Sequence, residues 1–382
     1  MYFLNPMRVY LDNAATTSID SAVLDVIFLQ LQSNFGNPSS IHSHGREARS
    51  AVENARKTIA RLLKCSPSEI FFTSGATEAD NMALAGSVYS LGIQHIITSP
   101  IEHYAVLHTA KWLSDKGLCQ MHFVKLDELG HVDINSLSKL LSTYPKALVS
   151  LMHGNNEVGN LTDIYSVSAL CRQYNAIFHS DTVQTIGHLP IDLQKLDIDF
   201  IVGSGHKFHG PKGVGFIYIN AKSKIESFVH GGAQERNMRG GTENVAGIVG
   251  MAKALEIVYA QMEENELKIK ALKHEMIAKL SASVADLLFN GDCLCDEKSL
   301  AHILSVATPV HEGNEMLLFN MDIEKISISG GSACTSGAMA ASHVLDALGV
   351  DEERGVIRFS FSKYTTSEEI DHVVAVLKKL FQ

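Results

Sequence analysis

Short apolar runs alternate with longer segments of helical periodicity through the first 250 residues. The apolar runs predict buried strands, and the periodic segments predict amphipathic helices. The predicted strands are 70–73, 95–98, 147–152 and 176–181, and the predicted helices are 46–64, 76–88, 104–116 and 167–174. Such an alternation predicts an α/β fold with a mostly parallel sheet and helices on both faces.

The pattern changes after Gly250. Residues 251–280 are charged, with apolar residues at helical spacing, and predict one long helix that connects two domains. Shorter strands follow, and residues 367–380 predict a final amphipathic helix. We expect this C-terminal part to form a smaller α/β domain.

Lys207 lies between two apolar runs, 200–202 and 214–219, that predict neighbouring buried strands. Glycines on both sides of the lysine let other groups approach its backbone. Burial and a nearby cation both favour the neutral amine, which forms a Schiff base with an aldehyde. A solvated lysine in a hairpin loop explains the same pattern.

Ligands of open α/β sheets bind beyond the carboxyl ends of the strands. Residues 73–78 join a strand to a helix N-terminus, where free N–H groups and the Thr77 hydroxyl suit a phosphate. An ordinary capping box built on Ser74 or Thr77 is the alternative. The chain has no Walker A pattern and no G-x-G-x-x-G after a first strand, so nucleotide binding is not indicated.

Four more polar residues occupy positions that suit a ligand. Asp181 closes a strand, where a carboxylate could pair with a protonated pyridine nitrogen or with a cation of its own chain. His103 could stack on a flat ring, and Asn156 could donate to a phenolic oxygen, although both also suit plain loops. Arg358, inside an apolar strand, could bind a carboxylate ligand or an internal Asp or Glu.

Cys334 is surrounded by small residues between 329 and 338. We expect a loop in which its sulfur is reachable, although an inert thiol is possible there. The other five cysteines lie in structural contexts, and the pair Cys293 and Cys295 is only a weak metal signal.

The bulk properties exclude several classes of protein. A net charge of -10 argues against a partner that is a nucleic acid or an anionic membrane. No apolar run is long enough to span a bilayer, and the first residues lack the pattern of a signal peptide. Six cysteines in 382 residues fit a reducing environment, so we expect a cytoplasmic protein.

Together these segments resemble the cysteine desulfurases of the NifS/IscS type, within the aminotransferase class V group of pyridoxal-phosphate enzymes. The resemblance covers nearly the whole chain. It rests on the segments 10–17, 36–40, 73–78, 205–213, 234–244 and 331–336. It implies fold type I, a homodimer, a large cofactor domain (17–262) and a small domain formed by both termini (1–16 and 263–382).

The resemblance also implies roles for individual residues. Lys207 would carry the cofactor, His103 would stack on its ring, and Asp181 would pair with the ring nitrogen. Gln184 would bond the phenolic oxygen, and Asn156, Arg358 and Asn13 would bind substrate. The phosphate would be held by Gly75, Ala76, Thr77, Ser204 and His206, with Thr242 reaching it from the partner subunit.

By the same resemblance, the enzyme would convert L-cysteine to L-alanine and leave a persulfide on Cys334. The sulfur would pass to an iron–sulfur scaffold or to another acceptor protein. No intrinsic metal is expected, although Cys334 could ligate a transferred iron–sulfur cluster. A selenocysteine lyase, an aminotransferase and a non-catalytic sulfur carrier stay open as alternatives.

This chain departs from the family's pattern in three places. Residues 338–344 read Ala-Met-Ala-Ala-Ser-His-Val, where the family has Leu-Glu-Pro before the Ser-His-Val. Ser362 and Lys363 replace a Gly-Arg pair after Arg358, and Ala233 replaces a glycine before Gln-Glu-Arg. None of these changes removes a catalytic group, but they leave the choice of partner and the dynamics of the loop open.

Overall fold

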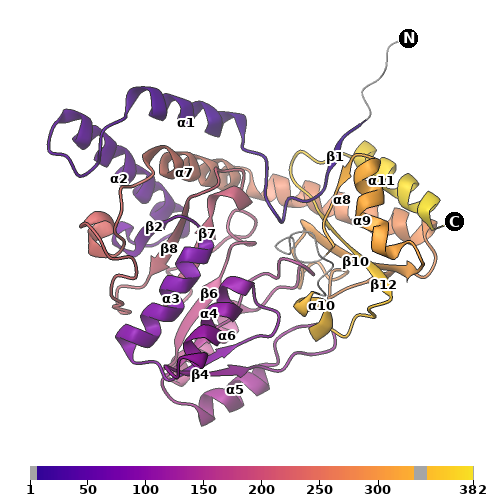
Figure 1. Ribbon diagram of the computed structural model, residues 1–382, viewed down its shortest axis with the longest axis horizontal. Helices are drawn as coiled ribbons and strands as arrows, with labels where there is room; N and C mark the ends of the chain where they lie inside the picture. Colours follow the sequence, from indigo (N-terminus) through magenta and orange to yellow (C-terminus); the bar gives the residue numbers. More distant parts are fainter. Residues whose placement is uncertain (1–6, 331–341, 382) are drawn as a thin grey trace.

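The structure is a computed structural model that describes residues 7–330 and 342–381 (Figure 1). A seven-stranded sheet forms the centre of the larger part, in the order β2-β8-β7-β6-β5-β3-β4. Its strands are β2 (Ile70–Thr73), β3 (His95–Thr98), β4 (Gln120–Phe123), β5 (Ala147–Ser150), β6 (Ile177–Asp181), β7 (Phe200–Ser204) and β8 (Gly215–Ile219). Only β8 runs opposite to the other six strands, which confirms the mostly parallel sheet.

Helices cover both faces of this sheet, as predicted. They are α1 (Ser21–Ser33), α2 (Ser43–Leu63), α3 (Ala76–Leu91), α4 (Tyr104–Asp115), α5 (Ile134–Thr143), α6 (Ile164–Gln173) and α7 (Val245–Ala260). One face packs against α2, α5, α6 and α7, and the other packs against α3 and α4. Because successive strand residues point to opposite faces, Phe72 joins the first cluster and Phe71 the second.

A second unit is built from both ends of the chain. Its strands are β1 (Val9–Tyr10), β9 (Leu288–Phe289), β10 (Ile303–Val310), β11 (Ile326–Ser327) and β12 (Arg354–Ser360). Its helices are α8 (Met262–Ser283), α9 (Leu317–Ile323), α10 (His343–Ala347) and α11 (Ser367–Leu380). The hydrophobic cluster of this unit includes Val9 and Leu11 from the N-terminal segment, which runs beside α8, α9 and α11 in Figure 1. The boundaries at 16/17 and 262/263 stay a prediction.

The prediction of one long helix over residues 251–280 is wrong. The chain instead forms α7 and α8, which meet at Gln261 with a bend of 73°. The two helices serve different cores, because α7 is buried against the large sheet while Ile269 and Met276 of α8 pack in the second unit. Of the described helices, none alone is long and apolar enough to cross a bilayer, and only α7 and α8 together reach that length and composition.

Three elements of the larger part were not predicted. They are α1, β4 and α5, and the short helices α9 and α10 of the second unit were not predicted either. The edge strand β4 reads Gln-Met-His-Phe, so polar and apolar residues alternate, and none of the four is buried. It therefore lacks the continuous apolar run that predicted the central strands.

Candidate active site

A cavity of about 590 Å³ opens at the carboxyl ends of the sheet strands. Eleven of the residues predicted for the site line it: Gly75, Ala76, Thr77, His103, Asn156, Asp181, Gln184, Ser204, His206, Lys207 and Arg358. Asn13 and Thr242 lie outside this cavity. Cys334 lies outside the described residues. Residues separated by almost 300 positions thus share one site.

Lys207 ends the 3-10 turn Gly205–Lys207, which directly follows β7. Its Nζ donates hydrogen bonds to the carbonyl oxygens of Ala14 at 2.6 Å and Ala15 at 3.0 Å. Neither alanine was predicted as a site residue, because a backbone carbonyl leaves no trace in the residue type. The sequence signal was their place inside the 10–17 segment.

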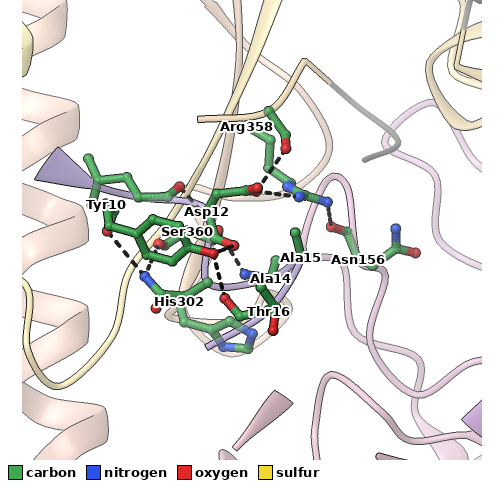
Figure 2. A network of polar contacts seen from close by, with 12 residues as sticks. Tyr10, Asp12, Ala14, Ala15, Thr16, Asn156, His302, Arg358 and Ser360 are labelled. Atoms are coloured by element: carbon green, nitrogen blue, oxygen red, sulfur yellow. Dashed lines mark hydrogen bonds and ion pairs between the residues drawn. The ribbon is translucent and has the colours of Figure 1, made fainter. Parts of the chain in front are cut away.

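The N-terminal segment that carries these carbonyls is tied to β12 (Figure 2). The Ala14 N–H donates to Ser360 Oγ at 2.9 Å, and Asn13 Nδ2 donates to the Ser360 carbonyl at 2.8 Å. Tyr10 OH donates to the Thr16 carbonyl at 2.7 Å. The buried Asn13 amide therefore connects the N-terminal segment to β12, and the predicted contact of Asn13 with substrate stays a prediction.

The N-terminus of α3 has no side-chain cap. Its N-cap is Gly75, and both the N–H and the Oγ of Ser74 bond the Glu78 carboxylate instead. The capping alternative built on Ser74 or Thr77 is therefore wrong. The N–H groups of this first turn and the positive end of the helix dipole stay available to an anion.

Two side chains at the end of β7 line the cavity together with this helix terminus. They are Ser204 and His206. Burial, with the nearby charges of Lys207 and Lys212, lowers the pKa of His206 to about 4, so its ring is neutral at physiological pH. A neutral imidazole, a hydroxyl and an uncapped helix terminus provide hydrogen-bond donors suited to phosphate.

Asp181 ends β6 and is buried. One carboxylate oxygen accepts the Val183 N–H at 2.9 Å, and no salt bridge to Asp181 exists among the described residues. Burial raises the pKa of Asp181, while His103 and Lys207 oppose that rise. The alternative of an internal Lys or Arg pair is not observed, and a ligand with a cationic ring N–H would stabilise the charge.

His103 is the N-cap of α4, and its Nδ1 accepts the Ala105 N–H at 3.1 Å. Its proton is therefore on Nε2. Burial lowers the pKa of His103, although the charge of Asp181 opposes this. The ring is thus a neutral, fixed plane beside the cavity, which fits stacking on a flat ligand.

Two buried carboxyl groups near Asp181 were not predicted. Burial raises the pKa values of Asp80 and Glu102 well above their usual range, and the charge of Asp181 raises both further. Carboxyl groups that share such a region cannot all be ionised. Of the three carboxyl groups, Asp181 is the one at which nearby side chains, His103 and Lys207, oppose the rise in pKa, so it is the one most readily ionised.

Arg358 adopts the internal pairing that the sequence left open. Its Nη2 bonds Asp12 Oδ1 at 2.8 Å, and its Nη1 donates to the Asn156 carbonyl at 2.8 Å (Figure 2). Its buried Nε has no partner among the described residues. Since Arg358 also lines the cavity, a carboxylate ligand would meet a guanidinium already held in place.

Comparisons with known proteins agree with this geometry. The model of the aminotransferase class-V family matches residues 9–373. Cysteine desulfurase IscS of Dictyoglomus turgidum is 40% identical over 98% of this chain and 95% of its own length. Putative cysteine desulfurase IscS 1 of Bacillus subtilis is 41% identical over 98% of this chain and 99% of its own length.

Solved structures give the same result. A NifS-like protein superposes with a TM-score of 0.90 at 39% identity, covering 98% of this chain and 99% of that protein. The structure of SspA in complex with cysteine superposes with a TM-score of 0.81 at 29% identity, over 94% of this chain and 100% of SspA. The chain belongs to the aminotransferase class-V family of pyridoxal-phosphate-dependent enzymes and, within it, to the cysteine desulfurases of the IscS and NifS type.

The cavity fits pyridoxal phosphate. The uncapped terminus of α3 suits the phosphate, the unpaired buried Asp181 suits the ring nitrogen, and Lys207 suits the aldehyde. Gln184 and His103 line the same cavity. We infer that these residues hold the cofactor.

We predict that Lys207→Ala loses covalently bound cofactor, because the amine that would form the Schiff base is removed. Borohydride reduction of the wild type, followed by peptide mapping, locates the modified residue. Lys212→Ala is the matched control, since Lys212 lines the same cavity and should stay dispensable. Labelled Lys212 in the wild type would contradict the assignment.

We predict that Arg358→Lys weakens cysteine binding by on the order of 1.5–3 kcal/mol and leaves cofactor content unchanged. The planar guanidinium of Arg358 bonds Asp12 and the Asn156 carbonyl and can also bind a substrate carboxylate. The ammonium group of a lysine lacks this geometry. Titration of cysteine against the absorbance of the bound cofactor measures the loss. Arg354→Lys is the control, because Arg354 lies on the same strand but pairs with the exposed Asp286. Equal affinities in both variants would leave Arg358 with only a structural role.

Proposed function

We propose that this protein removes sulfur from L-cysteine, releases L-alanine and passes the sulfur to an acceptor through a persulfide on Cys334. The observation that carries the proposal is the convergence of Lys207, Asp181, the uncapped α3 terminus and Arg358 on one cavity. A solved relative, SspA, is described in complex with cysteine, which supports cysteine as substrate.

The roles of the chain's own residues follow from their positions. Pyridoxal phosphate, when bound, supplies an aldehyde for amines and a ring that withdraws electrons from the substrate. Arg358 orients the substrate carboxylate, and Lys207 Nζ moves the proton at the substrate Cα. The buried Asp181 keeps the ring nitrogen protonated.

The sulfur step requires a second nucleophile. The Cys334 thiolate attacks the substrate sulfur, so an S–S bond forms while the Cβ–S bond breaks. The electron pair of the broken bond stays on carbon, which takes up a proton and leaves as the methyl group of alanine. The sulfur stays on the enzyme as a persulfide.

Both described ends of the segment that carries Cys334 are attached near the cavity. Ser329 Oγ donates to Asp12 Oδ1 at 2.8 Å, beside the Arg358 pair. His343 Nε2 bonds the Glu102 carbonyl at 2.8 Å, next to His103. These two attachments support the proposal that Cys334 serves this cavity.

The acceptor is an iron–sulfur scaffold or another sulfur-carrier protein, in the cytoplasm. All five described cysteines are free thiols, which supports a reducing environment. Burial raises the pKa of Cys65 and of Cys171 to about 12 and that of Cys293 to about 11, so these three thiols do not compete as nucleophiles.

We predict that Cys334→Ser binds cofactor and still shifts its absorbance with cysteine, yet forms neither alanine nor sulfide. A hydroxyl cannot store sulfur as a persulfide. The assay measures alanine and sulfide from cysteine with a thiol reductant, and mass spectrometry tests the wild type for the persulfide. Cys295→Ser is the control, since Cys295 is a partly exposed thiol elsewhere. Near-normal alanine formation by Cys334→Ser would favour a lyase instead.

The enzyme acts as a homodimer in this proposal. Helix α1 and the loop after it expose a set of large apolar side chains: Leu24, Phe28, Leu29, Leu31, Phe35 and Ile41. A monomer rarely exposes so many large apolar groups together, and a second copy of the chain is the occupant we propose. Thr242 is exposed and lies outside its own cavity, which leaves it available to the partner's phosphate site.

We predict that Phe28→Glu yields monomers with weakened cofactor retention, because it places a charge in the apolar face. Size-exclusion chromatography with light scattering measures the mass. Leu267→Glu is the matched control, since Leu267 of α8 is 65% exposed and Phe28 is 67% exposed. A dimeric Phe28→Glu protein would place the interface elsewhere.

A further inference from the structure

The amide of Gln184 has one orientation that satisfies its neighbours. Its Nε2 donates to the Ala14 carbonyl at 3.0 Å, and its Oε1 lies 3.3 Å from His302 Nε2. An exchange of amide nitrogen and oxygen would place two oxygen acceptors against each other at Ala14. Because an amide oxygen only accepts, His302 Nε2 must carry a proton.

Neighbouring groups hold the His302 ring in the orientation in which its Nε2 faces Gln184 Oε1. Its ring is buried and stacks on His188, with ring centroids 3.8 Å apart and planes inclined by 18°. The His188 ring forms a hydrogen bond with the main chain of Lys207. The carbonyl of His302 accepts the Phe361 N–H at 2.9 Å, which fixes the start of β10 beside the end of β12.

The pKa of His302 and its contact with Gln184 together indicate a neutral ring with one tautomer. Burial lowers the pKa of His302 well below its usual range, and nearby His188 and cationic side chains lower it further. The ring is therefore neutral and carries one proton. The contact with Gln184 Oε1 places that proton on Nε2.

We propose that His302 is a positioning residue that turns the Gln184 amide nitrogen toward the cofactor. With one N–H used by the Ala14 carbonyl, the second N–H of Gln184 is available to an acceptor in the cavity that Gln184 lines. In the proposed enzyme that acceptor is the phenolic oxygen of the cofactor ring. This inference rests on the proposed function and adds a residue that does not itself line the cavity.

A second cavity also reaches the His302 ring. His188 and His302 both line a space of about 430 Å³, beside α8 and the segments that follow β5 and β6. Removal of the His302 ring would join its volume to this space. A free imidazole molecule could then enter and donate to Gln184 Oε1.

The test compares His302→Gln, which keeps an N–H donor, with His302→Met, which has a similar size and no donor. The readouts are cofactor retention and the pH titration of the cofactor's visible absorbance. We expect His302→Met to shift the titration upward by up to about one unit, since a hydrogen bond changes an equilibrium by up to about tenfold. His302→Gln should stay near the wild type.

Two further measurements separate positioning from a merely structural role. The double variant of His302→Met with Gln184→Met should be no worse than Gln184→Met alone, because the two residues act through one contact. Added imidazole should restore the titration of His302→Ala toward that of the wild type and leave the titration of His302→Met unchanged. The rescue of His302→Ala also tests the proposal if His302→Met does not fold.

Additive effects of the two substitutions, or an unchanged titration in a folded His302→Met, would overturn the proposal. So would a failure of imidazole to restore His302→Ala. Cofactor binding by the wild type distinguishes a failure of this proposal from a failure of the proposed function. A wild type that bound no cofactor would overturn the function itself, whereas a normal wild type with unaffected variants would overturn only the role of His302.

Discussion

The burial of the Asp181 carboxylate is the constraint on which the site depends. A buried carboxylate is costly without a cationic partner, and the described residues give Asp181 only a backbone N–H at 2.9 Å. Burial raises the pKa values of Asp80 and Glu102 well above their usual range, which disfavours further negative charge beside Asp181. A ligand with a cationic ring nitrogen would therefore stabilise the ionised form of Asp181.

A second constraint is the supply of hydrogen-bond partners at the sheet edge. The carbonyls of Ala14 and Ala15 would be left without donors if the N-terminal segment stood alone there. Lys207 supplies those donors from the large sheet, and Ser360 fixes the same segment from β12. The N-terminal segment is thus the physical link between the lysine and the second unit.

Sequence patterns predicted those parts of the fold that depend on local burial. The limits of β2 and β3 agree with the apolar runs at 70–73 and 95–98, and α11 agrees with the amphipathic pattern at 367–380. The break at Gln261 was missed because apolar spacing continues across it, and only the change from one core to the other bends the chain.

The candidate site was predictable where a side-chain type implies a chemistry. Lys207, Asp181 and Arg358 all line the cavity, since a lysine, aspartate or arginine in an apolar context is costly without a function. The predicted contact of Asn13 with substrate stays a prediction, and the structure adds a hydrogen bond from its amide to the Ser360 carbonyl, which the sequence did not indicate. The internal partner of Arg358, Asp12, could not be chosen from 42 acidic residues without the pairing of the two chain ends.

The two residues of β12 that reach the site are two positions apart, so their side chains leave the strand on the same face. Ser360 holds the segment whose carbonyls bond Lys207, and Arg358 holds Asp12 of that same segment. A displacement of β12 would therefore move the substrate-facing guanidinium and the lysine's hydrogen-bond partners together. A carboxylate ligand at Arg358 would thus be connected mechanically to the environment of Lys207, through one strand and the four residues 12–15 of the N-terminal segment.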